Sequence, residues 1–199
     1  MSYAAHPPSA IAQAPLPEVV SLEKNHRILI VDDNEAIHDD FRKILQCDDD
    51  EADFDSHEAQ IFGEATQTHR RTRFEMDFAF QGDEAVECIS DSIKAGRRFA
   101  LAFLDVRMPP GLDGLHTAAK LWKVDPDVQV VICTAYSDYS WEEMMELIGN
   151  PERLLILKKP FDAIEVVQLA HALSEKWSLL QVVRRYTQSL EHVVKDRTS

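Results

Sequence analysis

Apolar and polar positions along the chain follow two periods, one typical of strands and one typical of helices. The run from Ile28 to Val31 is short, continuous and β-branched, which is typical of a strand buried on both faces of a sheet. The next stretch spaces its apolar residues three and four positions apart, which predicts an amphipathic helix. The same alternation predicts strands at 27–31, 74–80, 99–104, 128–133 and 153–157, and helices at 35–46, 82–96, 115–123, 140–148 and 161–194.

Repeated strand–helix alternation predicts an α/β fold, a doubly wound parallel sheet with helices on both faces. Residues 74–80 alternate between apolar and polar or small side chains, so this strand is predicted to lie near an edge of the sheet. Ligands of such sheets bind outside the carboxyl ends of the strands. The residues that follow each strand are therefore the candidates for chemistry.

Three segments depart from this alternation. Residues 1–24 are rich in proline and alanine, which predicts a disordered tail. Residues 47–73 form an insertion that begins with seven acidic residues and no lysine or arginine between Asp48 and Glu58. The last helical pattern runs well beyond the point where a domain of this kind would end.

Composition excludes several classes of function. The chain carries 35 acidic and 21 basic side chains, a net charge of −14, which argues against direct binding of nucleic acid and against an anionic membrane surface. No apolar run is long enough for a transmembrane helix, and the first residues do not form a signal peptide. Three scattered cysteines indicate neither a disulfide framework nor a zinc site, so a cytoplasmic location is expected.

Polar residues follow four of the five predicted strands. Asp32 and Asp33 end the first strand, Asp105 the third and Thr134 the fourth, and Lys159 follows the fifth. Parallel strands share one carboxyl edge, so the fold would gather these groups. Carboxylates so close repel one another, and a cation is needed to keep them ionised. Oxygen ligands suit Mg²⁺, and a metal beside a carboxylate and a lysine is typical of a site that receives a phosphoryl group.

These strand ends resemble the motifs of the response-regulator receiver domain of two-component signalling. The matching pieces are Ile-Leu-Ile-Val-Asp32-Asp33, Phe-Leu-Asp105-Val-Arg-Met-Pro109, Val-Ile-Cys-Thr134-Ala135 and Leu-Lys-Lys159-Pro160-Phe161. The resemblance covers residues 26–173 apart from the insertion. It implies the flavodoxin-like receiver fold, with five parallel strands in the order 2-1-3-4-5. The expected organisation is a tail at 1–24, a receiver domain at 25–173 with the insertion at 47–73, and a helical coiled-coil linker at 174–199.

The resemblance also implies a mechanism. Asp105 would be the phosphoacceptor, taking a phosphoryl group from a phosphohistidine of a histidine kinase or a histidine phosphotransfer domain. Asp33 and Asp105 would bind Mg²⁺ directly, with the backbone carbonyl of Arg107 as a third protein ligand. Asp32 would act on the metal through a bound water. Such a receiver catalyses its own phosphorylation and dephosphorylation, and is not a conventional enzyme.

The resemblance also assigns roles to the residues at the ends of the fourth and fifth strands. Lys159, which precedes a candidate cis proline at Pro160, would pair with the acceptor carboxylate and then with the phosphoryl group. Thr134 would hydrogen-bond a phosphoryl oxygen and move on activation. The switch aromatic of the family is replaced by Ile156, and the loop after Asp105 holds one extra residue. Tyr136, Tyr139 and Trp141 are the candidates to substitute for the missing aromatic.

The last helix carries a heptad seam with two polar positions, which predicts a coiled coil. The seam consists of Val166, Leu169, Leu173, Lys176, Leu180, Val183, Thr187, Leu190 and Val194. Its second half extends beyond the domain, so a homodimer through this helix is expected, with packing onto the chain's own domain as the alternative. The helix resembles those that join receivers to output modules. The chain is therefore interpreted as the N-terminal receiver of a larger signalling protein, such as a hybrid sensor histidine kinase.

Two other functions fit parts of the pattern. A degenerate receiver acting as an interaction module is supported by Ile156. A phosphatase of the haloacid-dehalogenase kind also uses an aspartyl phosphate, but its nucleophile usually belongs to an Asp-x-Asp motif on the first strand, where this chain has Asp32-Asp33. His38 and His171 are interpreted as ordinary surface histidines on helices.

Overall fold

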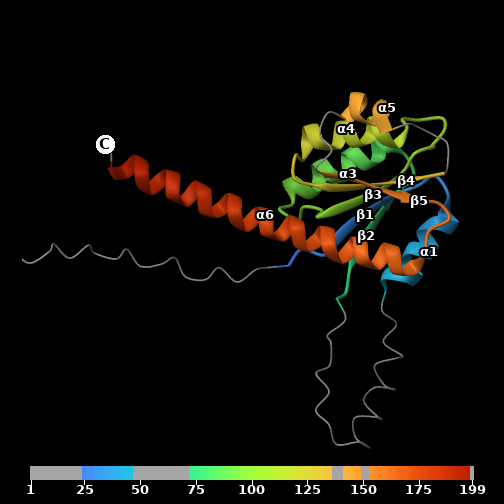
Figure 1. The fold of residues 1–199 in the computed structure, drawn as a ribbon, viewed down its shortest axis with the longest axis horizontal. Coiled ribbons are helices and arrows are strands. Elements are labelled where there is room, and N and C mark those ends of the chain that lie inside the picture. Colours follow the sequence, from blue (N-terminus) through green and yellow to red (C-terminus); the bar gives the residue numbers. More distant parts are fainter. Residues whose placement is uncertain (1–23, 47–71, 136–140, 149–152, 198–199) are drawn as a thin grey trace, which may run out of the picture.

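The computed structural model describes residues 24–46, 72–135, 141–148 and 153–197. Strands and helices alternate along this part of the chain, as the hydrophobic pattern predicts (Figure 1). The strands are β1 (Arg27–Val31), β2 (Glu75–Ala79), β3 (Leu101–Asp105), β4 (Gln129–Thr134) and β5 (Leu154–Lys158). The helices are α1 (Glu35–Leu45), α3 (Gly82–Lys94), α4 (Gly114–Val124), α5 (Trp141–Ile148) and α6 (Ala163–Arg197).

The five strands form one all-parallel sheet in the order β2-β1-β3-β4-β5, which confirms the predicted fold class and places β2 at an edge. In this register Asp105 lies opposite Cys133, and Thr134 lies opposite Lys158. The carboxyl ends of β1, β3, β4 and β5 therefore meet along one edge of the sheet, which from here on is called the carboxyl edge. The opposite edge, where the strands begin, is called the amino edge.

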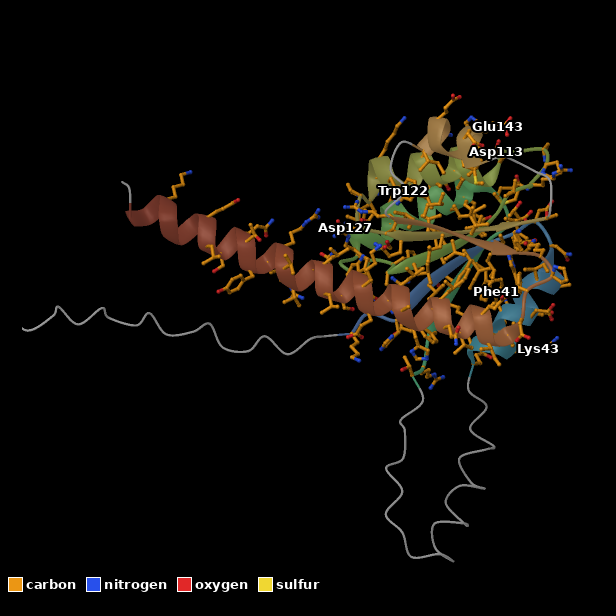
Figure 2. The ribbon with its side chains drawn as sticks, viewed as in Figure 1. Phe41, Lys43, Asp113, Trp122, Asp127 and Glu143 are labelled. Atoms are coloured by element: carbon orange, nitrogen blue, oxygen red, sulfur yellow. The ribbon has the colours of Figure 1, made fainter. Side chains whose placement is uncertain are left out.

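Helices cover both faces of the sheet and divide the core into two layers. One layer packs α3, α4 and α5 against residues such as Leu29 and Leu104. The other packs α1 and α6 against residues such as Ile30 and Phe103. Phe41 of α1 belongs to the second layer and lies with its ring centre 4.9 Å from that of Phe103 (Figure 2). Apolar residues occur consecutively in the central strands because both faces of the sheet are buried.

Side-chain caps begin the two helices that follow the acidic strand ends. The side chain of Asn34 accepts a hydrogen bond from the amide of Ala36 and starts α1 directly after Asp33. The side chain of Asp113 accepts one from the amide of His116 and starts α4. These caps hold the loops after β1 and β3 in place.

The last helix crosses the whole domain and continues past it (Figure 1). Val166, Ala170 and Leu173 are buried against the sheet. At the amino edge, Asn25 donates its backbone N–H to Ser178, and Arg184 pairs with Asp127. Beyond that edge the apolar side chains of α6 are exposed. Within the described residues, no helix has the length and hydrophobicity needed to cross a membrane.

Some expectations fall outside the described residues, and one is wrong. The insertion is not described between 47 and 71, nor are Tyr136 and Tyr139. The peptide bond before Pro160 is cis, as expected, and so is the one between Pro109 and Pro110. His38 is not a surface residue. It is 1% exposed, because the imidazole packs against Phe78 and Phe80 of the β2 strand and the turn after it.

We predict that Gly114→Ala destabilises the fold by about 1–3 kcal/mol, the usual cost of overpacking. A Cβ atom at Gly114 would overlap the carbonyl oxygen of Asp105, which belongs to the backbone and cannot move aside freely. The matched control is Gly111→Ala, whose Cβ would meet only the end of the flexible Gln81 side chain. Urea unfolding of both variants measures the difference. Equal stability of the two variants would contradict the close approach at Gly114.

Candidate functional site

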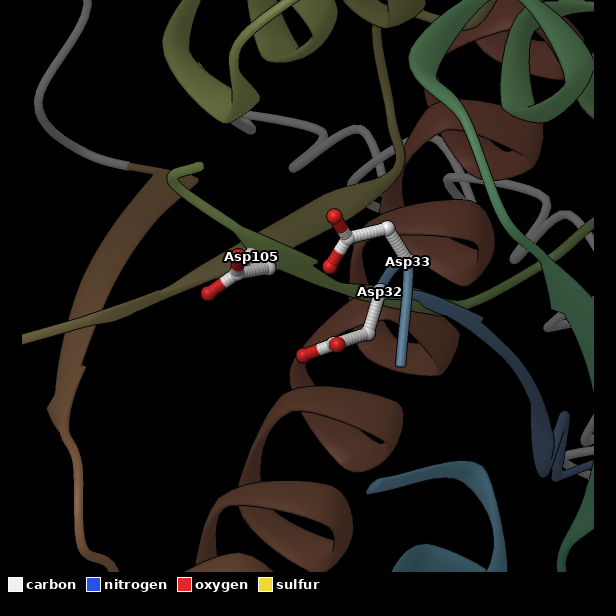
Figure 3. A group of neighbouring side chains, drawn as sticks. All are labelled: Asp32, Asp33 and Asp105. Carbon is white, nitrogen blue, oxygen red and sulfur yellow. The ribbon is translucent and has the colours of Figure 1, made fainter. Parts of the chain in front are cut away.

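Three carboxylates meet at the carboxyl edge of the sheet. Asp32 and Asp33 follow β1 and Asp105 ends the neighbouring strand β3, so the sheet itself brings them together (Figure 3). One carboxylate oxygen from each residue lies within 4.8 Å of the others. Asp32 is buried, Asp105 is partly buried and Asp33 is exposed. Within the described residues, Asp33 has no hydrogen-bond or ion-pair partner, so its charge is left to solvent or to a bound cation.

Lys159 supplies the positive charge of the site. Its Nζ donates hydrogen bonds to Oδ2 of Asp32 at 2.7 Å and to Oδ1 of Asp105 at 2.8 Å. The backbone N–H of Lys159 donates to the carbonyl oxygen of Thr134, which ties this end of β5 to β4. The second oxygen of Asp105 accepts the backbone N–H of Arg107 at 3.1 Å. Both oxygens of Asp105 are thereby oriented.

Burial is the largest influence on the pKa of Asp105. Partial burial raises the pKa of Asp105 above the usual value for an aspartate, and the negative charge of Asp32 raises it further. The hydrogen bond and the charge of Lys159, together with the amide of Arg107, lower it but do not cancel the rise. Ionised Asp105 is therefore less favourable in the folded chain than in water.

The lysine responds in the opposite sense. Burial lowers the pKa of Lys159, but hydrogen bonds to Asp105 and Asp32 and their charges outweigh it, so the net direction is upward. Lys159 is thus held as a cation at neutral pH. Burial raises the pKa of the neighbouring Cys133 thiol to about 12, which keeps this cysteine protonated and unreactive.

Thr134 and Ile156 lie on β4 and β5, the two strands on one side of β3. Thr134 ends β4, and its hydroxyl donates to the carbonyl oxygen of Ala135 at 2.8 Å. Ile156, at the place of the switch aromatic, is half-buried and packs against the core layer of α3, α4 and α5. The side chain of Trp141, the third candidate for that aromatic, lies outside the described residues.

The structure brings together Asp32, Asp33, Asp105 and Lys159, the four charged side chains that the sequence singled out. Two features were missed. Lys159 bonds Asp32 as well as Asp105, which no local pattern signals because the two residues are 127 positions apart. Gly114 allows α4 to begin against the backbone of Asp105, and the Asp113-Gly114 pair was the sequence signal for that close approach.

The donor set fits a hard divalent cation. All three acidic residues offer oxygen, which Mg²⁺ and Ca²⁺ prefer, and none of the three is a sulfur or imidazole ligand. Asp32 and Asp105 each accept two hydrogen bonds, Asp32 from Lys159 and Asn34 and Asp105 from Lys159 and Arg107. Burial is what separates the three acids, because Asp32 is buried, Asp105 is partly buried and Asp33 is exposed. This arrangement suits direct contact of a metal with Asp33 and Asp105.

Comparison with known proteins places this geometry in context. No family model matches the chain. Over 98 residues, 46% of its length, the chain is 32% identical to the oxygen regulatory protein NreC of Staphylococcus carnosus. The match covers 44% of NreC, so the chain spans less than half of that curated relative.

Solved structures give the fold. A CheY-like response regulator receiver domain protein from Methanospirillum hungatei is 20% identical, with a TM-score of 0.51 over 76% of this chain and 94% of that one. The receiver domain of NtrX from Brucella abortus is 26% identical, with a TM-score of 0.50 over 74% of this chain and 98% of that one. Fold and strand-end site define a flavodoxin-like α/β domain with an acidic centre. Within that class, the chain has the fold of CheY-like receiver domains and is similar in sequence to a response regulator over the matched residues.

We predict that Asp105→Asn raises the free energy of unfolding at neutral pH in metal-free buffer. Because the folded-state pKa of Asp105 is raised, its contribution to stability is fully present below the unfolded pKa and is lost as pH rises through the folded pKa. Asparagine does not ionise, so the variant does not lose stability as pH rises. Lys159 keeps Asp32 as its hydrogen-bond partner. The stability gap should narrow as pH falls toward the usual carboxyl range of about 4.

Chemical denaturation at several pH values measures this gap. The control is Glu87→Gln, an exposed acid on α3, which should leave the pH dependence of stability unchanged. A variant less stable than wild type at pH 7 without metal would mean that the Lys159 contact outweighs the burial of Asp105.

Proposed function

We propose that Asp105 is the phosphoacceptor of a two-component phosphorelay in the cytoplasm. It would receive its phosphoryl group from the phosphohistidine of a histidine kinase or a histidine phosphotransfer domain. The observation that carries the proposal is the double hydrogen bond of Lys159 to Asp32 and Asp105, beside the otherwise unpaired Asp33. A purely structural ion pair needs one carboxylate. Here Lys159 bonds two carboxylates and a third lies beside them, so the site is left with a net negative charge that a bound cation would offset.

In the proposed transfer a carboxylate oxygen of Asp105 attacks phosphorus. The new P–O bond forms as the P–N bond of the phosphohistidine breaks, and the imidazole leaves with the electron pair of that bond. Lys159 holds Asp105 in place before the transfer, and its ammonium group then faces the added negative charge. The amide of Arg107 fixes the other oxygen of Asp105. Hydrolysis of the acyl phosphate by water returns the free carboxylate.

Mg²⁺ is the proposed cofactor. When bound, it supplies positive charge that stabilises the phosphoryl oxygens during transfer. Asp33 and Asp105 would hold it directly, the backbone carbonyl of Arg107 would complete the protein ligands, and Asp32 would act through a water. The assignment of Asp32 is supported by its burial, which is deeper than that of Asp33 and Asp105.

Signal output is proposed to begin at Thr134. Its hydroxyl is bonded to the neighbouring carbonyl of Ala135, a contact that it can exchange for a phosphoryl oxygen. The phosphoryl group adds about −1.5 to −2 charges near Lys159 and so changes the balance of the site. Lys159 is followed within four residues by α6, which would carry the change toward an output module.

Two alternatives rest on specific residues. A degenerate receiver that serves as an interaction module is favoured by Ile156, since an aliphatic residue cannot swing between exposed and buried positions as the family aromatic does. A haloacid-dehalogenase-like phosphatase is disfavoured, because β1 ends in adjacent Asp32 and Asp33 and Asp105 lies on β3.

A homodimer through the outer half of α6 is the second part of the proposal. Leu180, Val183 and Leu190 of the heptad seam are 38%, 61% and 49% exposed. Leaving these apolar side chains in water is unfavourable, and a second copy of the same seam would bury them. The inner half of the seam is different, because Val166 and Leu173 already pack in the domain core.

Incubation with acetyl phosphate or beryllofluoride and Mg²⁺ tests the phosphoacceptor. Wild type is expected to take up one phosphoryl group or mimic, and Asp105→Asn none, because it lacks the nucleophilic oxygen. The matched control is Asp83→Asn on α3, an exposed residue at which uptake should persist. Intact mass spectrometry follows the phosphoryl group. Uptake by Asp105→Asn would sink the assignment, and no uptake by wild type would favour the interaction module.

Glutamate substitutions at exposed positions of the heptad seam test the proposed homodimer. We expect the double variant Val183→Glu, Leu190→Glu to weaken self-association by about 100-fold or more, because it removes two apolar contacts from each copy. The control, Gln188→Glu with Ser189→Glu, adds the same charge beside the seam. Light scattering against concentration reports the mass. If wild type remains monomeric at high concentration, the seam has another partner.

A further inference from the structure

A pocket of about 480 Å³ lies at the amino edge of the sheet, on the opposite side of the domain from Asp105. Its walls come from the residues that begin β1, precede β2 and precede β3, and from α6. Six of its lining side chains are cationic: Lys24, Arg27, Arg73, Arg97, Arg98 and Arg185. Glu75 is the single acidic residue in the lining. So many cations in one pocket stand out in a chain of net charge −14.

Four of these cations are paired with carboxylates. Lys24 pairs with Glu175, Arg27 with Asp77, Arg97 with Glu75, and Arg98 with Asp125. Arg73 and Arg185 have no hydrogen-bond or ion-pair partner among the described residues. Both are exposed, so their guanidinium groups are accessible from solvent.

Hydrogen-bond donors without partners line the same pocket. Trp177 is 9% exposed, yet its indole Nε1 has no acceptor in the described part of the chain. Nε2 of Gln181, one turn further along α6, is also buried and unpaired. A buried donor without an acceptor costs free energy, and a rotation of either side chain toward the pocket would let an oxygen of a ligand accept from it.

We propose that this pocket binds a small polyphosphate, held between Arg73 of the segment before β2 and Arg185 of α6. Guanidinium groups match phosphate oxygens through paired N–H donors. The volume suits a ligand of nucleotide size, since pockets of about 300–1,000 Å³ hold such molecules. Trp177, Gln181 and Arg185 all belong to α6, so the bound anion joins this helix to the amino edge of the sheet.

Calorimetric titration of residues 1–199 without Mg²⁺ tests the proposal, with pyrophosphate and ADP as separate probes. Saturable binding at one site is expected. Arg73→Gln and Arg185→Gln should each weaken it about tenfold, the effect of losing one charge-assisted contact. The matched control Lys123→Gln removes an exposed cation from the end of α4 and should bind as wild type. Tighter binding of ADP than of pyrophosphate would assign a nucleotide, and equal binding would assign the phosphates alone.

A second readout does not depend on the variants. The indole N–H resonance of Trp177 should shift on addition of either probe, and should not shift with NaCl of equal ionic strength. Absence of saturable binding, or equal affinity in the arginine variants and wild type, would overturn the proposal. Binding that becomes tighter in Asp105→Asn would place the anion at the carboxyl edge instead, because this substitution removes a negative charge that repels an anion there. Uptake of acetyl phosphate by Arg73→Gln separates this pocket from the phosphoacceptor, because that uptake should be unchanged.

Discussion

The contact of Lys159 with Asp32 and Asp105 is the interaction on which the carboxyl edge depends. Two partly or fully buried carboxylates repel each other, and burial alone would favour their protonation. The single ammonium group bonds both, and it is kept charged by the same two bonds. The compensation is incomplete, since the pKa of Asp105 remains raised and Asp33 adds a third negative charge. This imbalance of charge gives the site a physical reason to attract a cation.

The sheet supplies the geometry that this contact needs. β1 and β3 are neighbours, so their ends bring Asp32 and Asp105 together without help from loops. Lys159 directly follows β5, and β4 lies between β5 and β3. The long side chain of Lys159 reaches past the end of β4 to Asp105. The backbone bond from Lys159 to Thr134 holds the base of that side chain. Asp105, Lys159 and Thr134 are thus connected through the ends of three adjacent strands.

Hydrophobic periodicity was sufficient to predict the sheet, its edge strand and the strand ends that form the site. It succeeded because β1 and β3 are buried on both faces and their polar ends are abrupt. His38 was assigned to the surface because of its polarity, although it lies three residues before Phe41 on the buried face of α1, where two phenylalanines cover it. The heptad seam has two roles. The same spacing serves burial against the sheet at Val166 and exposure at Val183, and the sequence does not mark where one role ends.

The path of α6 explains how a local charge change at one edge can reach the other. The helix starts close to Lys159, packs Ala170 and Leu173 against the core, and meets the amino edge at Ser178 and Arg184. Asp127, which is almost fully buried, binds both Arg98 and Arg184 there (Figure 2). Breaking that bond would leave a buried carboxylate with one partner fewer, so the helix is held firmly at this point. In the proposed relay, a shift at the start of α6 would pass along the helix as a rigid body, with the contact of Arg184 and Asp127 as its pivot. An anion bound between Arg73 and Arg185 would stiffen the same contact. The proposed ligand and the proposed phosphorylation would then act on one helix from opposite edges of the sheet.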